Sequence, residues 1–201
     1  MSWIKTIDYS EADANLKRMY DRVKGPDNNV DNVLKIHSLR PHTLTGHMTL
    51  YKSVLHNSNN SLPKWYLEAI GVYVSYLNKC NYCVEHHFEA FARLLDDNEK
   101  SVQFLDGVQN DTLESFFDAK CFGGIIYARL LTLEQSKITK TTIDDLIALG
   151  FSEGEVLEIN KLASYFNYVN RMVVGLGVNT EGDVIGLSPN DNDNPKDWNH
   201  Q

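Results

Sequence analysis

Apolar residues recur every three or four positions through most of this chain, which is the spacing of one face of an α-helix. The segment from residue 63 to residue 77 shows this pattern most clearly, through Trp65, Leu67, Ile70, Val74 and Leu77. No segment shows the strict alternation that is typical of a half-buried strand, and residues 184–187 are too few to predict a sheet. The pattern therefore predicts an all-α fold.

Capping residues and turn residues divide the pattern into separate helices. Ser10 followed by Asp13 resembles a capping box, and Ser152 with Glu155 forms a second one before a long apolar pattern. Asn78 is placed to cap the next helix after residue 77. The expected helices cover residues 11–23, 33–37, 41–55, 63–77, 79–95, 100–108, 113–131, 142–149 and 153–174.

The length of 201 residues allows one well-packed domain, or at most two small ones. We expect residues 1–187 to form a single-domain helical bundle. Residues 188–201 are rich in Asn, Asp and Pro, which predicts an extended or disordered polar tail that Trp198 could anchor to a surface.

Charge and hydropathy exclude several classes of function. The formal net charge of −8 argues against binding to nucleic acid or to an anionic membrane surface, because both need clustered Lys and Arg. The N-terminal residues do not resemble a signal peptide, and no run approaches 18 apolar residues. We therefore expect a cytoplasmic protein, in a compartment that keeps thiols reduced.

Two of the three cysteines form a Cys-x-x-Cys pair, which is the first feature that points to chemistry. On a helix with about 100° per residue, Cys83 lies about 60° from Cys80, and His87 lies about 20° from it. His86 lies roughly 120° away, so the geometry favours His87 as the partner of the thiols. The third cysteine, Cys121, is expected to be a plain core thiol.

A thiol at the start of a helix faces free backbone N–H groups and the positive end of the helix dipole, which favour the thiolate. This argument favours Cys80 as the more acidic thiol. A thiolate can attack a peroxide oxygen, and the resulting sulfenic acid can condense with the second thiol to a disulfide. His87 could relay the proton, and Glu68 is the nearest carboxylate in sequence that could orient it.

The spacing Glu68-x11-Cys80-x2-Cys83-x3-His87 resembles the active-site motif of the alkylhydroperoxidase D family, within the carboxymuconolactone decarboxylase-like superfamily. Segments 36–41, 81–87 and 170–178 are similar to its uncharacterised peroxidase-related branch. The resemblance covers roughly residues 3–178.

This resemblance implies an all-helical peroxidase-like thiol oxidoreductase of antioxidant defence, assembled as a dimer, trimer or hexamer. It implies that Cys83 attacks the hydroperoxide, that Cys80 resolves the sulfenic acid, and that Glu68 and His87 relay protons. An external dithiol would reduce the disulfide, and no metal or organic cofactor would be needed. One departure is Tyr82, which stands where characterised members can carry a His; a Tyr is a poor base near neutral pH.

Four other interpretations of the motif remain open. The pair could exchange disulfides with a protein partner, or only report redox state in an oligomeric sensor protein. With His87 and Glu68, the two cysteines also supply four zinc-compatible ligand types. Some members of the superfamily without this dithiol are lyases or isomerases.

The aromatic residues before and within the motif are expected to serve the core and a subunit interface: Trp65, Tyr66, Tyr73, Tyr76 and Tyr82.

Overall fold

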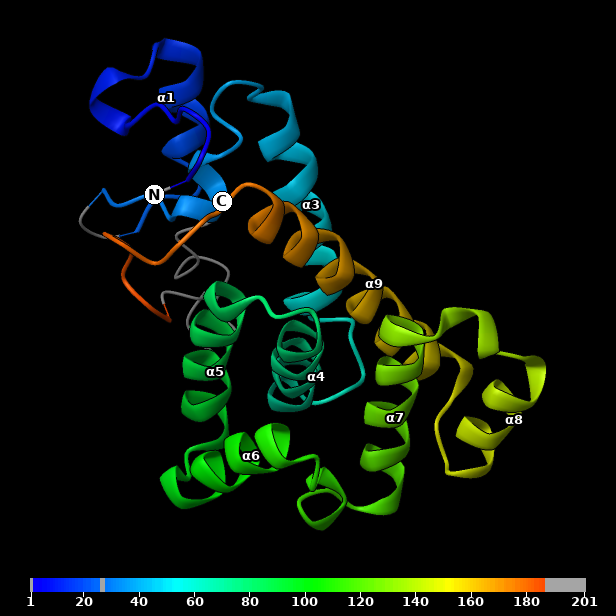
Figure 1. Ribbon diagram of the computed structural model, residues 1–201. Helices are drawn as coiled ribbons and strands as arrows, with labels where there is room; N and C mark the ends of the chain where they lie inside the picture. The colour runs from blue at the N-terminus through cyan, green and yellow to red at the C-terminus, as the bar shows by residue number, and fades with distance from the viewer. Residues whose placement is uncertain (1, 26–27, 187–201) are drawn as a thin grey trace.

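The computed structural model describes residues 2–25 and 28–186, and every regular element in these ranges is a helix (Figure 1). The all-α prediction is therefore confirmed. The α-helices are α1 (Ala14–Tyr20), α2 (Asn32–Lys35), α3 (His42–Leu55), α4 (Lys64–Leu77), α5 (Asn81–Leu95), α6 (Asn98–Asn110), α7 (Ala119–Leu133), α8 (Lys140–Ala148) and α9 (Glu153–Gly175). Short 3₁₀ turns cover Tyr9–Glu11, Leu113–Ser115 and Gln135–Lys137. The tail predicted at 188–201, with Trp198, lies outside the described residues.

Helix α4 forms the centre of the larger core. Ten consecutive residues, from Tyr66 to Ser75, are buried, and Figure 1 shows α4 enclosed by α5, α6 and α7. A helix that is apolar on all sides is stable only where other elements surround it. Helix α9 packs closely on α4 at Gly71, where a Cβ would clash with the ring of Phe166.

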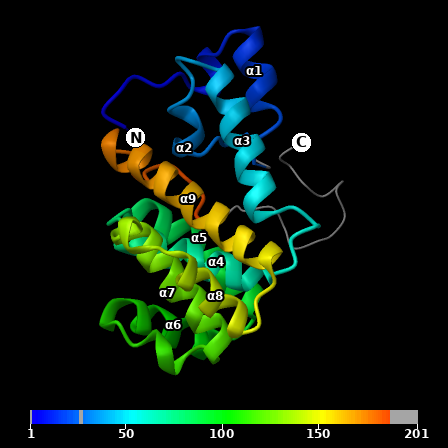
Figure 2. The ribbon, with the colours of Figure 1, turned by 90° about the vertical axis from the view of Figure 1, so that its right-hand side faces the viewer.

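The N-terminal helices build a second, smaller core around Leu16, Tyr20, Leu34 and Leu44. Figure 2 shows α1, α2 and α3 as a layer above α4–α8, with α9 running between the two. Tyr51 packs against both cores, so the two are joined. Over the described ranges, no helix is both long and apolar enough to cross a bilayer.

Several helix boundaries follow local chemistry that the pattern only partly predicts. The first helix begins later than expected, because Asp13, and not Ser10, accepts a hydrogen bond from the N-terminal backbone, at Leu16. The helix expected at 113–131 is interrupted, since Asp118 caps a new start at α7. The capping box of Ser152 and Glu155 is present as predicted.

Candidate active site

The junction between α4 and α5 places the two cysteines. Lys79 adopts a left-handed conformation (φ 58°), and Cys80 then takes the N-cap position of α5. The expectation that Asn78 caps this helix is wrong. Asn78 ends α4 instead, and its side chain donates hydrogen bonds to Asn167 and Asn170 on α9.

Both thiols are buried, and they interact with each other. The hydrogen bond from the Cys83 thiol lowers the pKa of Cys80, and the backbone N–H of Cys83 adds to this effect. Burial raises the pKa of Cys83 well above its ordinary value, and the interaction with Cys80 raises it further. Two groups coupled in this way titrate as a pair, so the reduced dithiol holds one proton more loosely and one more tightly.

Asn170 ties the dithiol to the core, a role that no sequence pattern revealed. Its side chain is fully buried and donates to Ser75 Oγ at 3.0 Å, while its carbonyl oxygen accepts from Asn78 at 3.0 Å. Its side-chain amide also lowers the pKa of both Cys80 and Cys83. Asn170 therefore stabilises the thiolate form of the pair.

Glu68 and His87 form the pair that the sequence predicts. His87 Nδ1 lies 2.7 Å from Glu68 Oε2, and the carboxylate is almost wholly buried on α4. The imidazole and the ring of Phe166 pack nearly perpendicular to each other, at 4.7 Å between ring centroids. Since the carboxylate accepts the Nδ1 proton, a neutral His87 presents Nε2 as its basic nitrogen.

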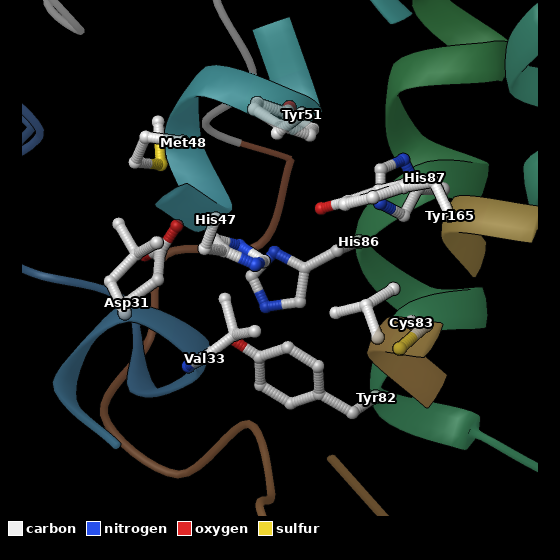
Figure 3. Close-up of a pocket in the computed structure, with 12 residues that line it drawn as sticks. Asp31, Val33, His47, Met48, Tyr51, Tyr82, Cys83, His86, His87 and Tyr165 are labelled. Atoms are coloured by element: carbon white, nitrogen blue, oxygen red, sulfur yellow. The ribbon is translucent and has the colours of Figure 1, made fainter. Parts of the chain in front are cut away.

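A cavity of about 70 Å³ opens beside Cys83, where α2, α3, α5 and α9 meet (Figure 3). One water molecule needs roughly 10–15 Å³ in this measure, so the cavity is larger than a single hydrogen peroxide molecule requires. Its lining combines thiol, imidazole, carboxyl, phenol and apolar groups: Asp31, Val33, Leu34, His47, Met48, Tyr51, Tyr82, Cys83, His86, His87, Tyr165 and Val169.

His86 also reaches this cavity, although the helical wheel places it away from the thiols. Its ring packs against Tyr82 at 4.6 Å, and its Nε2 lies 3.6 Å from Asp183 Oδ2, beyond hydrogen-bond distance. The wheel angle of His86 is taken from Cys80, whereas the cavity is lined by Cys83, from which His86 lies only about 60° away. The cavity therefore contains two histidines of the motif segment, of which His87 alone is paired with Glu68.

Tyr82 is fixed in place by the segment that follows α9. Its hydroxyl donates to Asp183 Oδ2 at 2.7 Å and accepts from the backbone N–H of Val33 at 3.2 Å. Burial raises the pKa of Tyr82 well above its ordinary value, and the charge of Asp183 adds to this effect. The residue between the two cysteines is therefore a neutral phenol that connects α2, α5 and Asp183, and it cannot act as a base near neutral pH.

A second cavity, of about 230 Å³, lies on the side of Cys80. It is bordered by residues of the α4–α5 junction, of the end of α9 and of the segment after it: Lys79, Cys80, Asn81, Tyr82, Glu85, Val173, Val174, Val178, Asn179 and Thr180. The dithiol thus lies between two cavities, with Cys83 facing one and Cys80 facing the other.

The remaining candidates lie elsewhere or lack the required arrangement. Cys121 is on α7, where burial raises its pKa to about 11. Among residues 2–25 and 28–186, no three His, Cys, Asp or Glu side chains are arranged to hold a metal ion. The zinc interpretation is therefore not favoured, and Glu68 is instead engaged by His87.

No protein-family model matches this chain, and no curated protein matches it. Solved structures do match over nearly the whole length. One is an alkylhydroperoxidase AhpD core, an uncharacterized peroxidase-related protein from Ralstonia eutropha JMP134, with TM-score 0.77, 18% identity, and coverage of 89% of this chain and 91% of the other. Another is an uncharacterized peroxidase-related protein from Silicibacter sp. TM1040, with TM-score 0.76, 22% identity, and coverage of 90% and 95%.

A third similar structure is that of an enzyme named for a different activity. It is the debrominase Bmp8, with TM-score 0.68, 15% identity, and coverage of 89% of this chain and 90% of the other. Identities this low establish a shared fold.

Proposed function

We propose that this chain, which has the alkylhydroperoxidase D-like fold, reduces hydroperoxides through the dithiol of Cys80 and Cys83. One observation carries the proposal: the cavity beside Cys83 also contains His87, and His87 is held by the buried carboxylate of Glu68. A thiol with an acceptor for its proton and a space for a small substrate is the arrangement that a thiol peroxidase needs.

The first step is attack by Cys83. His87 accepts the Cys83 proton at Nε2, and Glu68 stabilises the imidazolium that forms. The thiolate attacks one oxygen of the hydroperoxide, so that an S–O bond forms and the O–O bond breaks. The departing alkoxide takes the proton from His87 and leaves as an alcohol, and Cys83 becomes a sulfenic acid.

The second step is closure of the disulfide by Cys80. Its lowered pKa favours the thiolate, which attacks the sulfur of the Cys83 sulfenic acid. The S–S bond forms, the S–O bond breaks, and hydroxide leaves as water after taking a proton. The position of Cys80, three residues before Cys83 at the start of α5, allows the bond to form with little backbone movement.

The third step is reduction by an external dithiol. Cys80 borders the second cavity, so a reductant can approach from the side opposite to the hydroperoxide. One thiolate of the reductant attacks the sulfur of Cys80, the S–S bond breaks, and Cys83 leaves as a thiolate. The second thiolate of the reductant then attacks this mixed disulfide, which releases Cys80 and leaves the reductant as a disulfide. A reducing compartment such as the cytosol supplies such dithiols, and we place the protein there.

The test is thiol titration of the reduced protein before and after it reacts with hydrogen peroxide or with tert-butyl hydroperoxide. The proposal predicts loss of the Cys80 and Cys83 thiols, and their recovery with dithiothreitol. If no hydroperoxide oxidises the pair but a protein disulfide does, the chain is a thiol–disulfide oxidoreductase. If oxidation occurs but is not followed by turnover with any dithiol, a redox-sensing role is the better description.

A second candidate is reductive debromination, which the fold shared with a debrominase and the aromatic lining of the cavity favour. In this reaction the Cys83 thiolate attacks bromine, the S–Br bond forms as the C–Br bond breaks, and the carbanion takes a proton. Cys80 then displaces bromide and closes the same disulfide. Bromide release from a small brominated heteroaromatic, measured by ion chromatography, separates this activity from hydroperoxide reduction.

A further inference from the structure

We propose that the end of the cavity remote from Cys83, formed by Asp31 and His47, binds a hydrogen-bond donor group of a small organic substrate. This inference rests on the proposed function, because it names the class of molecule that the thiol site accepts. In Figure 3, Asp31 and Cys83 lie at opposite sides of the cavity, and the imidazoles of His47 and His86 lie between them.

The first support is a set of buried polar atoms without partners. His47 is 5% exposed, and its Nδ1 has no hydrogen-bond partner. The same holds for Asp31 Oδ1. His86 Nε2 also makes no hydrogen bond, but it lies 3.6 Å from Asp183 Oδ2 and so does not belong to this set. Each unsatisfied buried polar atom costs about 1–3 kcal/mol, so two of them beside one cavity are a disadvantage for a purely structural role. A ligand with a polar group would satisfy them.

The second support is the charge of the lining, which selects the kind of polar group. No Lys or Arg is among the described residues that line the cavity, whereas Asp31 supplies a carboxyl group. Burial, with a smaller effect from His37, lowers the pKa of His47 to about 3, so this imidazole is neutral. An anionic group would therefore meet no Lys or Arg side chain and would be repelled by Asp31. A neutral imidazole can accept or donate, and Asp31 Oδ1 accepts, so an O–H or N–H group is the complementary partner.

The third support is the shape and polarity of the space between the two ends. Val33, Met48, Tyr51 and Tyr165 provide apolar and aromatic surface there. A ligand that reaches both ends needs an apolar body, a reactive group that faces Cys83 and a donor group at Asp31. Hydrogen peroxide has no such body, so the cavity favours a small organic substrate over hydrogen peroxide.

The experiment measures the binding of three matched probes to the reduced protein by ligand-observed NMR. Phenol carries an O–H donor, anisole replaces that hydrogen with methyl, and benzoate carries an anionic group. We expect phenol to bind at least tenfold more tightly than anisole and benzoate, since hydrogen bonds to charged groups contribute about 1.5–3 kcal/mol.

Two variants assign this preference to Asp31. Asp31→Asn should bind phenol about tenfold more weakly than the wild type and should leave anisole binding unchanged. The control is Asp8→Asn, which alters an exposed carboxylate outside the cavity and should bind all three probes as the wild type does.

Equal affinity of the wild type for phenol and anisole, or no binding of phenol at millimolar concentration, would overturn this inference. Unchanged phenol binding by Asp31→Asn would overturn it as well. None of these measurements involves thiol chemistry, so their failure is distinct from failure of the proposed function. If phenol binds as expected and no hydroperoxide oxidises Cys83, the binding site stands and the hydroperoxide reaction does not.

Discussion

At the scale of single residues, Cys80 and Cys83 differ in what surrounds them. Cys80 is the thiol with the lowered pKa, whereas Cys83 faces the cavity that contains His87. The two sulfurs are coupled, so the more acidic thiol of the resting pair need not be the one that attacks. We assign attack to Cys83, because it is the thiol that shares a cavity with a paired base.

The roles of the two thiols can be separated by substitution. Cys83→Ser should abolish turnover with hydroperoxide, because no sulfur then faces the cavity. Cys80→Ser should still undergo one oxidation, and mass spectrometry of a dimedone-treated sample should show a trapped sulfenic acid. Cys121→Ser is the control and should turn over like the wild type. Full oxidation of Cys83→Ser at the wild-type rate would reverse the assignment.

The Glu68–His87 pair should govern the rate at which Cys83 is oxidised. His87→Ala and Glu68→Gln should each slow the reaction, by about 10²-fold for His87, with both thiols intact. The double variant should lose less than the sum of the two effects, because the residues act as one unit. Stopped-flow kinetics measures this. His42→Ala, which removes an exposed imidazole at the start of α3, is the control. Additive effects of the two substitutions would argue against a relay.

Asp31 should lower the free energy of unfolding at neutral pH. Such a cost to stability is expected of a residue whose role is to bind a ligand. Burial, followed by the charge of Asp183, raises the pKa of Asp31 from 3.8 to about 6. Between pH 4 and 6 the folded state therefore binds more protons than the unfolded state, and stability falls as pH rises through this window. Above pH 6 this loss amounts to at most about 3 kcal/mol.

Asp31→Asn should therefore be more stable than the wild type at pH 7, and the two should converge near pH 4. Urea unfolding at both pH values measures the difference, in which the titration of His47 cancels because both proteins retain it. A variant that is less stable than the wild type at pH 7 would contradict the raised pKa.

At the scale of the elements, the junction between α4 and α5 and its contact with α9 build the site. The helical spacing groups Cys80, Cys83 and His87, and Glu68 is predicted as the nearest carboxylate in sequence. The structure confirms the contact between Glu68 and His87. The same spacing cannot reveal Asp31, His47, Asn170 or Asp183, which reach the site only through tertiary packing. Each of these four residues stands alone in its segment, so no repeating spacing marks it. Segment 170–178 resembles the peroxidase-related branch, but this resemblance assigns no role to Asn170.

Helix boundaries show the same limit of sequence patterns. The apolar spacing at 113–131 continues across Asp118, yet this side chain caps a new helix. At Asn78, two acceptors on α9 compete with the capping role and define the end of α4. Local capping rules name residues that can cap a helix, and tertiary partners decide which of them do so.

The link between α9 and the dithiol can be tested at Asn170. Asn170→Ala removes the amide that lowers the pKa of both thiols, and the apparent pKa of the thiol pair should rise by about one unit. Ultraviolet absorbance of the thiolate against pH measures this. Asn160→Ala, which removes a hydrogen bond to Tyr127 on the same helix, is the control and should leave the thiol pKa unchanged. An unchanged thiol titration in Asn170→Ala would remove Asn170 from the account.

At the scale of the whole molecule, we propose a homo-oligomer. Tyr66 and Tyr73 of the aromatic α4 are buried within the subunit, whereas Tyr76 on the same helix is 39% exposed. Other apolar side chains are exposed as well: Val102 on α6 is 66% exposed, Leu157 on α9 57% and Leu133 on α7 48%. We propose that a second subunit covers part of this exposed apolar surface. Light scattering at micromolar concentration should give a multiple of the subunit mass, and a monomer would contradict the proposal.

The central claim is that an organic hydroperoxide oxidises this dithiol. Its most direct test is a single-turnover stopped-flow reaction of the reduced protein with tert-butyl hydroperoxide, with thiols and tert-butanol quantified at the end. The account predicts one molecule of alcohol for each disulfide formed between Cys80 and Cys83. Thiols that remain fully reduced in excess hydroperoxide, with no alcohol formed, would contradict it.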